Sequence, residues 1–586
     1  MHSRRGARVA NVEPLGQAGT ASGDDAAAYA ARARRLGLSF APFVDLAHSA
    51  EPYTAAAIRD ATFAMSAYGE RLAYIAPPES QMPHVQQWLR ANPAARARLR
   101  VTTPAAIRSA LERADASALL DNAVNGLARA HPRFSAAVVA TRAQVVAWLV
   151  IAAAIVAAFA LAPTVALSLP DVVGALFFFG VSAIRLVAAS RVAAQAMPQP
   201  VTPVVADDLP VYTILVPLYR EAHLLPELVA SLERLEWPRE RLDIKLVLEA
   251  SDPETVRAAA HAIRGRAGYE VVVVPQGGPQ TKPKALSFAL PLARGEFVAV
   301  YDAEDRPHPA QLRQAHAAFA AAGPEVACIQ ASLVIDNAAA GWLPLMFAVE
   351  YAALFDGLLP TLAAHDMPLP LGGTSNHFRR GALEAVGGWD PFNVTEDADL
   401  GLRFARLGYR ALTMPLATHE DAPVALRAWL NQRTRWFKGW MQTWLVHTRS
   451  PVRLARELGV NGLLGFMLVG TGLIVSSLIY PIYLVSLVVA VADPLGMWTR
   501  GGLLAAAMLG VNLFNLIAGY VAMAMLSGRA LAARGRRVPR GSLALLPLYW
   551  LLMSLAAYRA VWELARRPHH WAKTEHAHHV PPLPSP

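Results

Sequence analysis

The sequence of 586 residues has one cysteine, Cys328, and only five lysines among its 54 basic residues. A single cysteine cannot close an internal disulfide, which excludes a disulfide-stapled scaffold and indicates reducing surroundings or no use for sulfur. Charged residues make up 17% and hydrophobic residues 54%, against about 25% and about 45–50% in ordinary soluble domains. This composition excludes a disordered chain. The apolar excess is too small for a chain embedded throughout, so it predicts a membrane protein with a large soluble part.

No long apolar run occurs in the first 140 residues, which argues against a secretory signal peptide. The net charge of +10 could indicate a nucleic-acid partner. The sequence has no aromatic–basic repeat, zinc-ligand spacing or basic helix that would support this interpretation. We therefore predict no nucleic-acid partner and attribute the charge largely to arginines that flank the apolar segments.

Apolar residues cluster on either side of a polar block. The apolar runs span residues 145–161, 172–189, 463–492, 503–526 and 543–561. A helix needs about 20 such residues to cross a bilayer. We expect two transmembrane helices within 143–190 and three or four transmembrane or interfacial helices within 460–565.

The distribution of arginine predicts the orientation of these helices. The loop 528–541 holds five arginines, and the tail 566–586 is also basic. Basic segments stay on the cytoplasmic side of a membrane, so both are expected there. A cytoplasmic tail requires an even number of crossings after the polar block. Either the run 463–492 makes two short passes hinged at Pro481, or the run 543–561 does not cross completely.

The polar block, residues 195–459, begins with alternating strand-like and helix-like segments. The strand-like runs span residues 211–216, 244–248, 271–274 and 296–301. The segment between the first two has the apolar spacing of an amphipathic helix. This alternation predicts an α/β fold with a parallel sheet, in which ligands bind at the carboxyl ends of the strands.

Acidic residues follow three of these strands. They are Glu221 after the first strand, Glu249 and Asp252 after the second, and Asp302, Glu304 and Asp305 after the fourth. Carboxylates gathered at one edge repel each other unless a cation or a ligand lies among them. Asp302 and Glu304 are spaced to hold Mg²⁺ or Mn²⁺ whose remaining ligands are substrate phosphates. Taken alone, the acidic turn also fits a solvated loop.

Three further motifs lie downstream. Residues 372–376 read Gly-Gly-Thr-Ser-Asn, where a ligand could approach the backbone closely. Thr-Glu-Asp at 395–397 precedes a helical segment, and Asn-Gln-Arg-Thr-Arg-Trp occupies 431–436 among several tryptophans. Each motif also has a structural interpretation by itself, as loop glycines, a helix cap and an interfacial aromatic belt.

The order and spacing of these motifs resemble those of the processive, membrane-embedded family-2 glycosyltransferases, the group of cellulose, chitin and hyaluronan synthases. The resemblance covers residues 209–442 by motif and the flanking apolar helices by layout. It implies a GT-A-type α/β domain over 195–459 inserted between transmembrane helices. It further implies a metal-dependent hexosyltransferase in the bacterial inner membrane, with its catalytic domain in the cytoplasm.

The resemblance also implies roles for individual residues. The nucleoside would be held by Tyr219, Glu221 and Glu249, with Asp252 as the alternative to Glu249 because the family usually has Asp at this position. The diphosphate would be held by Lys284, Gln432 and Arg435. Mg²⁺ or Mn²⁺ would be held by Asp302 and Glu304, with Asp305 as a stand-in ligand. Asp397 would be the general base, and Trp436 would stack on the acceptor sugar.

By this resemblance the chain would make a β-linked polysaccharide by inverting, processive transfer, with β-glucan from UDP-glucose as the expected product and export across the inner membrane. Its partners would be the nucleotide-sugar donor, the growing polysaccharide, the lipid bilayer and accessory export proteins. The alternative is non-processive transfer of one sugar to a lipid carrier, although such enzymes commonly lack Gln-x-x-Arg-Trp. A receptor or transporter that only binds a nucleotide sugar would have no use for Asp397.

The two ends of the chain carry separate signals. Residues 1–26 are expected to be disordered, and residues 27–132 to form a small α/β module. Its strings ARRLGLSFAPFVDL and LAYIAPPE resemble the N-terminal domain of type II secretion ATPases. This implies a docking or structural module, with cyclic di-GMP sensing as the alternative. The tail 566–586 has five histidines between His569 and His579, where a metal site is an alternative to a cytoplasmic tail motif.

Overall fold

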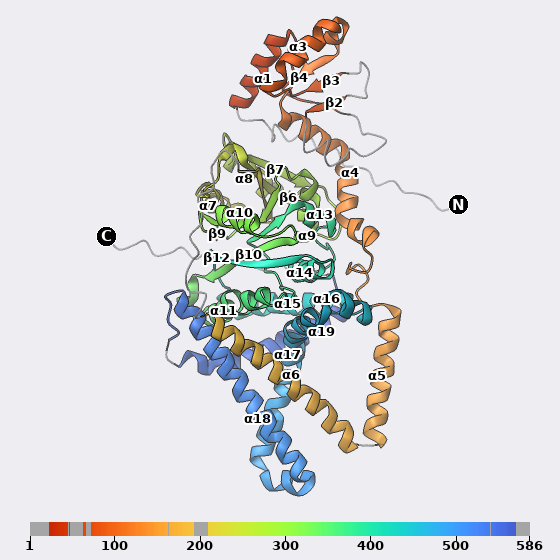
Figure 1. Cartoon of the computed structure of the whole chain (residues 1–586), viewed down its shortest axis with the longest axis vertical. Helices are drawn as coiled ribbons and strands as arrows, with labels where there is room; N and C mark the ends of the chain where they lie inside the picture. The colour runs from red at the N-terminus through yellow and green to blue at the C-terminus, as the bar shows by residue number, and fades with distance from the viewer. Residues whose placement is uncertain are drawn as a thin grey trace, which may run out of the picture.

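The computed structural model describes residues 23–44, 46, 62–65, 72–161, 163–192, 209–539 and 541–569. Along its longest axis the molecule has three parts: a small N-terminal module, a central sheet with its helices, and a group of long helices at the opposite end (Figure 1). The predictions for residues 1–22 and for the histidines after His569 lie outside the described residues.

The N-terminal module contains both strands and helices. Its strands are β1 (Ser39–Phe40), β2 (Phe63–Met65), β3 (Ala73–Ile75) and β4 (Leu99–Val101), in the order β1-β4-β3-β2. Its helices are α1 (Gly23–Leu36), α3 (Met82–Ala91) and α4 (Pro104–Ala130). The Thr103 side chain caps α4 by accepting a hydrogen bond from the Ala106 N–H (3.1 Å). Helix α4 extends to the central part, where Leu120 lies against Gly277.

The central sheet has eight strands in the order β7-β6-β5-β8-β11-β10-β12-β9. They are β5 (Tyr212–Leu218), β6 (Leu242–Glu249), β7 (Tyr269–Val274), β8 (Phe297–Val300), β9 (Arg306–Pro307), β10 (Val326–Ile335), β11 (Asn376–Arg379) and β12 (Arg410–Glu420). The four predicted strands, β5 to β8, are parallel neighbours. Strand β11 is antiparallel to both β8 and β10, so the whole sheet is mixed and not purely parallel.

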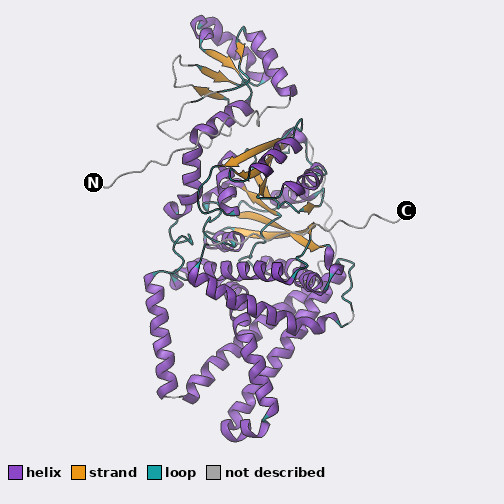
Figure 2. Cartoon of the chain, turned by 180° about the vertical axis from the view of Figure 1, so that it is seen from behind, coloured by secondary structure: helices purple, strands orange, loops and turns teal. Residues whose placement is uncertain are grey.

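Helices cover both faces of this sheet (Figure 2). They are α7 (Leu225–Glu233), α8 (Pro253–Ala262), α9 (Lys282–Ala289), α10 (Gln311–Ala321), α13 (Arg380–Ala385) and α14 (Glu396–Arg406). Successive side chains of a strand point to opposite faces. Accordingly, Ile214 and Val216 of β5 pack in the core under α7, α8 and α10, whereas Leu215 packs in the core on the other side, with α9. The carboxyl ends of β5, β6 and β8 therefore meet at one edge of the sheet.

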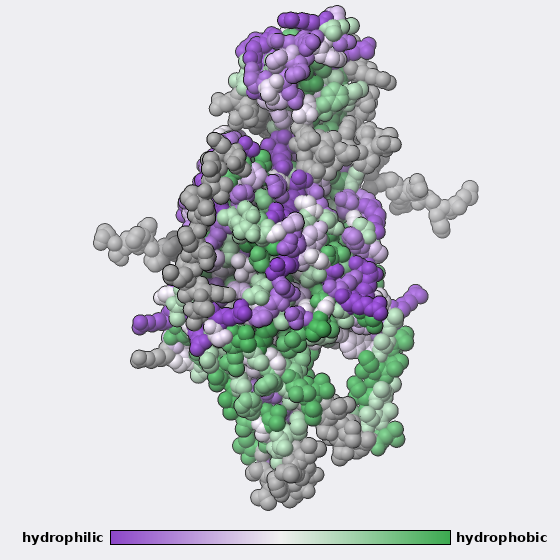
Figure 3. Space-filling view, in the orientation of Figure 1, coloured by the Kyte–Doolittle hydropathy of each residue, from purple (hydrophilic) through white to green (hydrophobic). Residues whose placement is uncertain are grey.

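The long helices form the third part. They are α5 (Arg142–Leu161), α6 (Pro163–Val192), α11 (Trp342–Ala353), α12 (Leu359–Ala364), α15 (Leu426–His447), α16 (Pro451–Gly465), α17 (Gly472–Ala492), α18 (Pro494–Ala533) and α19 (Leu546–Arg566). Within the described residues, six helical stretches are long and apolar enough to cross a membrane. Hydrophobic surface gathers over this end of the molecule (Figure 3). One of the six, Trp342–Ala364, was not expected and is 67% buried, so we assign it to the core.

Three of the six stretches follow the sheet in sequence. Helix α17 continues through Pro481 without a break, so the alternative of two short passes hinged there is wrong. The backbone instead breaks at Gly459, which has a φ of 64°. The last helix, α19, is held against α15 by hydrogen bonds from Arg433 to Tyr549 and from Lys438 to Glu563, both 3.1 Å. This pairing favours the other alternative, in which the last apolar run does not cross completely.

A buried ionic cluster ties β5, β6 and β7 together. Lys245 of β6 has no exposed side-chain surface and contacts Glu270 (2.6 Å) and Asp243 (3.3 Å). The Asp243 carboxylate also accepts hydrogen bonds from Thr213 (2.8 Å) and from the Arg294 side chain (3.0 Å). Burial would raise the pKa of Asp243, but Lys245 and Arg294 outweigh it and hold this pKa well below its usual range. The cluster is thus stable only while each carboxylate keeps its cation.

We expect Lys245→Met to lower the free energy of unfolding by about 3–5 kcal/mol, because it leaves two buried carboxylates without their shared cation. Thermal unfolding of the purified full-length protein measures the loss. The exposed Arg264 serves as the control, and Arg264→Met should change stability by less than about 0.5 kcal/mol. Equal unfolding temperatures for the two variants would contradict the prediction.

Candidate active site

A cavity of about 410 Å³ opens at the carboxyl edge of the sheet. Nine of the predicted site residues line it: Tyr219, Glu221, Glu249, Asp302, Glu304, Asp397, Gln432, Arg435 and Trp436. Residues 372–374 of the glycine-rich turn and the neighbouring Glu396 also line it, as do side chains from the long helices α6, α17 and α18. Asp252, Asp305 and Lys284 are absent from its lining.

Glu249 and Asp252 have different positions, which separates the two nucleoside alternatives. Asp252 caps α8 by accepting from the Thr255 N–H (3.2 Å) and also accepts from the Arg220 N–H (2.5 Å). Arg220 has a positive φ of 54°, so Asp252 stabilises an uncommon turn conformation. Asp252 thus maintains the turn after β5, while Glu249 remains the carboxylate that faces the cavity.

The two lysines at the start of α9 also differ, and the assignment of Lys284 to the diphosphate must be corrected. Lys284 has no exposed surface and donates to Glu249 and to the Gly277 carbonyl, both at 2.9 Å. Lys282 is the lysine that lines the cavity, where it contacts Asp302 and donates to the Gly373 carbonyl (2.7 Å). Residues two apart on a helix lie on nearly opposite faces. Only one lysine of this pair can therefore point into the cavity.

The acidic turn after β8 presents two carboxylates to the cavity, those of Asp302 and Glu304. The Oδ2 of Asp305 accepts hydrogen bonds from the Asp302 N–H (2.7 Å) and from Thr374 and so shapes the turn, while its buried Oδ1 has no hydrogen-bond partner among the described residues. Among the described residues no group of three or more metal-ligating side chains occurs. Two carboxylate ligands fit Mg²⁺ or Mn²⁺, which commonly takes its other ligands from substrate phosphates and water. The donor set therefore fits the predicted metal.

Asp397 lies in the first turn of α14, facing the glycine-rich turn. Its Oδ1 accepts a hydrogen bond from the Ala398 N–H (2.8 Å). Its Oδ2 would lie 3.3 Å from a Cβ at position 373, so Gly373 allows this close approach. Burial raises the pKa of Asp397, although the Ala398 N–H, Lys282 and Arg435 act in the opposite direction. Burial and the Asp397 charge raise the pKa of Glu396 to about 7.

Helix α15 brings Gln432, Arg435 and Trp436 to the cavity. The Gln432 Oε1 is buried and has no hydrogen-bond partner within the described residues, which leaves an acceptor for a ligand. Burial lowers the pKa of Arg435, while Glu396 and Asp397 act to raise it. Trp436 is stacked near Tyr351 of α11, with ring centroids 6.4 Å apart and planes at 24°. Tyr351 was not among the predicted site residues, because it lies within an apolar run that has no sequence motif.

Beyond these aromatic rings the cavity is lined by apolar side chains of the long helices. They are Val181 and Ile184 of α6, Leu473 of α17, Met523 and Leu526 of α18, and Met553 of α19, together with the cation Arg185. The cavity thus connects a charged end at the sheet edge with an apolar end between helices. Aromatic side chains lie between the two.

Comparison with known proteins identifies the central part. The family model described as Glycosyl transferase family 2 matches residues 213–378, and that described as Glycosyl transferase family group 2 matches residues 297–526. The chain contains family-2 glycosyltransferase domains. This confirms the predicted family-2 glycosyltransferase domain, and with the mixed sheet it supports the GT-A-like fold.

The relatives of the family-2 region differ in their names. A probable glucomannan 4-beta-mannosyltransferase of Arabidopsis thaliana is 26% identical over 249 residues, which are 40% of this chain and 43% of the relative. A beta-monoglucosyldiacylglycerol synthase of Nostoc sp. is 26% identical over 284 residues, 46% of this chain and 58% of the relative. The chain thus spans about half the length of these curated relatives.

Among solved structures, the mannosyltransferase PcManGT of Pyrobaculum calidifontis, in complex with GDP-Man and Mn²⁺, is 22% identical. The match covers 66% of this chain and 96% of that one, with a TM-score of 0.45.

The positions of the two lysines generate a testable difference. We expect Lys282→Met to weaken the binding of UDP or GDP by about 10- to 100-fold, because a charged hydrogen bond to the diphosphate is lost. Lys284→Met should instead lower the unfolding temperature, because Glu249 loses its buried cation. Nucleotide titration by calorimetry and thermal unfolding, applied to both variants, measure the two effects. Tight nucleotide binding by Lys282→Met would contradict the revised assignment.

Proposed function

We propose that the chain is an inverting hexosyltransferase that moves a sugar from a nucleotide sugar to an acceptor hydroxyl. One observation carries the proposal: the candidate base and the candidate donor site meet across the glycine-rich turn. Asp397 lies against Gly373, whose carbonyl binds Lys282, and Lys282 in turn contacts Asp302. A base, a cation and a metal-binding carboxylate therefore surround one small volume, as a single displacement requires.

The charged end of the cavity would bind the donor. Tyr219, Glu221 and Glu249 surround the space at the ends of β5 and β6 and would hold the nucleoside. Asp302 and Glu304 would hold Mg²⁺ or Mn²⁺, which when bound neutralises charge on the departing diphosphate. Lys282 and Arg435 would contact the diphosphate as fixed positive charges in a partly dry site. The unpartnered Gln432 would donate to or accept from the donor beside them.

Asp397 would act as the general base. Its carboxylate takes the proton of the acceptor hydroxyl as the hydroxyl oxygen bonds to the anomeric carbon. The bond from that carbon to the diphosphate breaks in the same step, and the nucleoside diphosphate leaves with the bonding electron pair. Because the acceptor attacks opposite the leaving group, an α-linked donor gives a β-linked product.

We further propose that the reaction is processive and makes β-glucan from UDP-glucose at the cytoplasmic face of the bacterial inner membrane. The stacked Trp436 and Tyr351 support this, because aromatic faces bind sugar rings and both residues line the cavity. The similarity to a probable glucomannan 4-beta-mannosyltransferase also supports a polysaccharide product. Accessory export proteins would then receive the polymer.

A second candidate is transfer of one sugar to a lipid. The observation that favours it is the apolar end of the cavity, where Leu473, Met523 and Leu526 offer no hydrogen bonds to a sugar chain. The similarity to a beta-monoglucosyldiacylglycerol synthase also supports a lipid acceptor. The two candidates share the donor site and the base, and they differ only in the acceptor.

Product analysis separates the candidates and tests the base. Full-length protein in liposomes is given labelled UDP-glucose, UDP-GlcNAc or GDP-mannose, and the products are sized. Polymer supports processive synthesis, and a labelled lipid supports the second candidate.

We expect Asp397→Asn to lower turnover by about 10²–10⁴-fold while nucleotide affinity stays within about twofold, because the donor contacts remain. Unchanged turnover in this variant would overturn the base assignment.

The raised pKa of Asp397 predicts the pH dependence of turnover. The base works only as a carboxylate, so turnover should fall as the pH decreases through this pKa. We expect the acidic limb of the pH–turnover profile to lie above the ordinary Asp pKa of about 4. The midpoint of this limb should belong to the Glu396–Asp397 pair, because neighbouring carboxylates titrate together. Turnover at saturating donor from about pH 4 to 8 measures the limb. A limb at the ordinary Asp value would contradict the expectation.

A further inference from the structure

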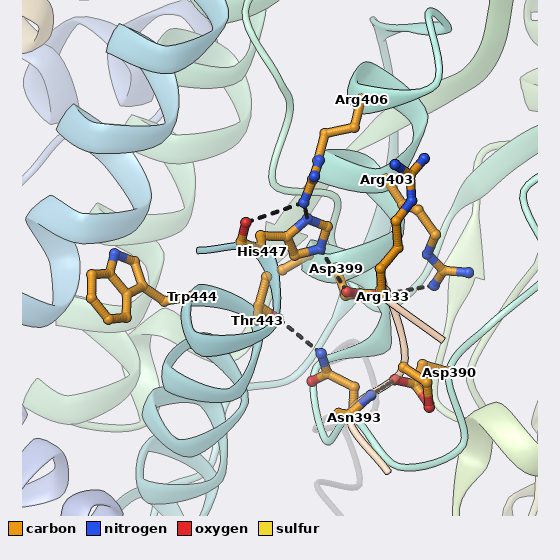
Figure 4. A network of polar contacts seen from close by, with 12 residues as sticks. Arg133, Asp390, Asn393, Asp399, Arg403, Arg406, Thr443, Trp444 and His447 are labelled. Carbon is orange, nitrogen blue, oxygen red and sulfur yellow. Dashed lines mark hydrogen bonds and ion pairs between the residues drawn. The ribbon is translucent and has the colours of Figure 1, made fainter. Parts of the chain in front are cut away.

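A polar network joins helices α14, α15 and α16 to the segment that leaves the N-terminal module (Figure 4). This segment, residues 131–138, is held by Arg449 at the end of α15. Arg449 donates to four of its backbone carbonyls, those of Pro132, Arg133, Ser135 and Val138. The Ala136 N–H donates to Asp390 (2.5 Å), which precedes α14. The segment therefore packs as an integral part of the family-2 domain.

Asp399 and His447 form the centre of the network. Asp399 lies two residues after Asp397 on α14 and has no exposed surface. Its carboxylate contacts Arg403 (2.5 Å) and the Nε2 of His447 (2.9 Å) on α15. The Nδ1 of His447 lies 3.1 Å from a nitrogen of Arg406. Arg406 can only donate, so Nδ1 accepts and Nε2 carries the proton that is donated to Asp399.

The segment directly before α14 also contacts α15, closer to the cavity. The Asn393 amide donates to Thr443 (2.9 Å), and the Val394 N–H donates to Gln442 (3.1 Å). Gly439 of α15 lies so close to Thr395 that a Cβ there would meet its hydroxyl at 2.3 Å. The first turn of α14, which carries Asp397, is thus fixed against the helix that carries Arg435 and Trp436.

Phe134, from the segment 131–138, fills the space under this pair. Its ring is fully buried and lies 5.7 Å from the His447 ring. The Arg406 guanidinium lies 5.0 Å from the ring centroid, and Arg406 also binds Glu457 of α16 (2.8 Å). A buried charged network adds little net stability compared with an apolar core. Its hydrogen bonds are directional, however, and they admit one spacing of the helices.

We propose that Asp399 and His447, packed on Phe134, are positioning residues that set the distance between Asp397 on α14 and the Arg435 and Trp436 side chains on α15. This rests on the proposed role of Asp397 and goes beyond it, because neither residue lines the cavity. A shift of the base by about 1 Å can cost about 100-fold in rate. The proposed nucleoside contacts at the ends of β5 and β6, and Lys282 of α9, belong to other elements, so nucleotide binding should change much less than turnover.

Two substitutions of His447 in the full-length protein test the proposal. His447→Phe keeps a ring on Phe134 but removes both hydrogen bonds, and we expect turnover to fall by about 30- to 100-fold with the KM for the donor within about twofold. His447→Gln can still donate to Asp399 and accept from Arg406, so it should keep at least about half of the turnover. Arg453→Ala is the control, because Arg453 contacts Glu457 at the exposed edge of the network, and it should behave as the unchanged protein.

A second measurement does not depend on turnover. Hydrogen exchange of the α14 amides should accelerate in His447→Phe and stay near the unchanged rate in His447→Gln. The proposal is overturned if His447→Phe turns over normally, if His447→Gln is equally impaired, or if nucleotide binding is lost together with turnover. If Asp397→Asn remains active while the exchange result holds, the assigned base fails and the positioning of α14 does not.

Discussion

The constraint on which the site depends is the crowding of carboxylates at one edge of the sheet. Parallel strands bring Glu249 and Asp302 together at their carboxyl ends, and α14 adds Glu396 and Asp397 from the opposite side. Like charges at this density are tolerated only when each has a partner or gives up its charge. Lys284 neutralises Glu249 and Lys282 neutralises Asp302. Burial and nearby carboxylates raise the pKa of Glu420 at the cavity wall well above its usual range. Under the proposed function, a divalent cation and a diphosphate would complete such a site, because their charges offset each other.

The features that the sequence predicted are those that depend on neighbours along the chain. The strands β5, β6 and β8 and their acidic ends follow from short apolar runs and the residues directly after them. The choice between Lys282 and Lys284 depends on how α9 is rotated about its axis. Two lysines separated by one residue at the start of a helix do not reveal which of them faces the cavity. The antiparallel strand β11 pairs with β8 across about 80 residues of chain, and no local pattern encodes that pairing. Tyr351 was missed because an aromatic residue in an apolar run has the same pattern whether it packs in a core or lines a cavity.

The long helices show the same limit at larger scale. Hydropathy located five of the six apolar stretches within the described residues but could not distinguish a helix that faces lipid from one that faces protein. Helix α5 is exposed along its entire apolar length, whereas the stretch Trp342–Ala364 is two-thirds buried. Helix α19 has both characters, since it is apolar yet held by polar contacts to α15. A helix fixed in this way lies beside the cavity, which Met553 of α19 lines, and holds α15 in place, which a freely tilting membrane helix could not do.

The scarcity of lysine acquires a physical meaning in this context. All four lysines within the described residues are paired with carboxylates: Lys245 with Asp243 and Glu270, Lys282 with Asp302, Lys284 with Glu249, and Lys438 with Glu563. Arginine, by contrast, serves where several acceptors must be bound at once, as Arg449 does with four carbonyls. A guanidinium is broad and planar, whereas an ammonium is a compact charge on a flexible stem. In a chain that otherwise uses arginine, lysine thus remains where a compact cation pairs with a carboxylate inside the protein, and one of those places is the charged end of the cavity.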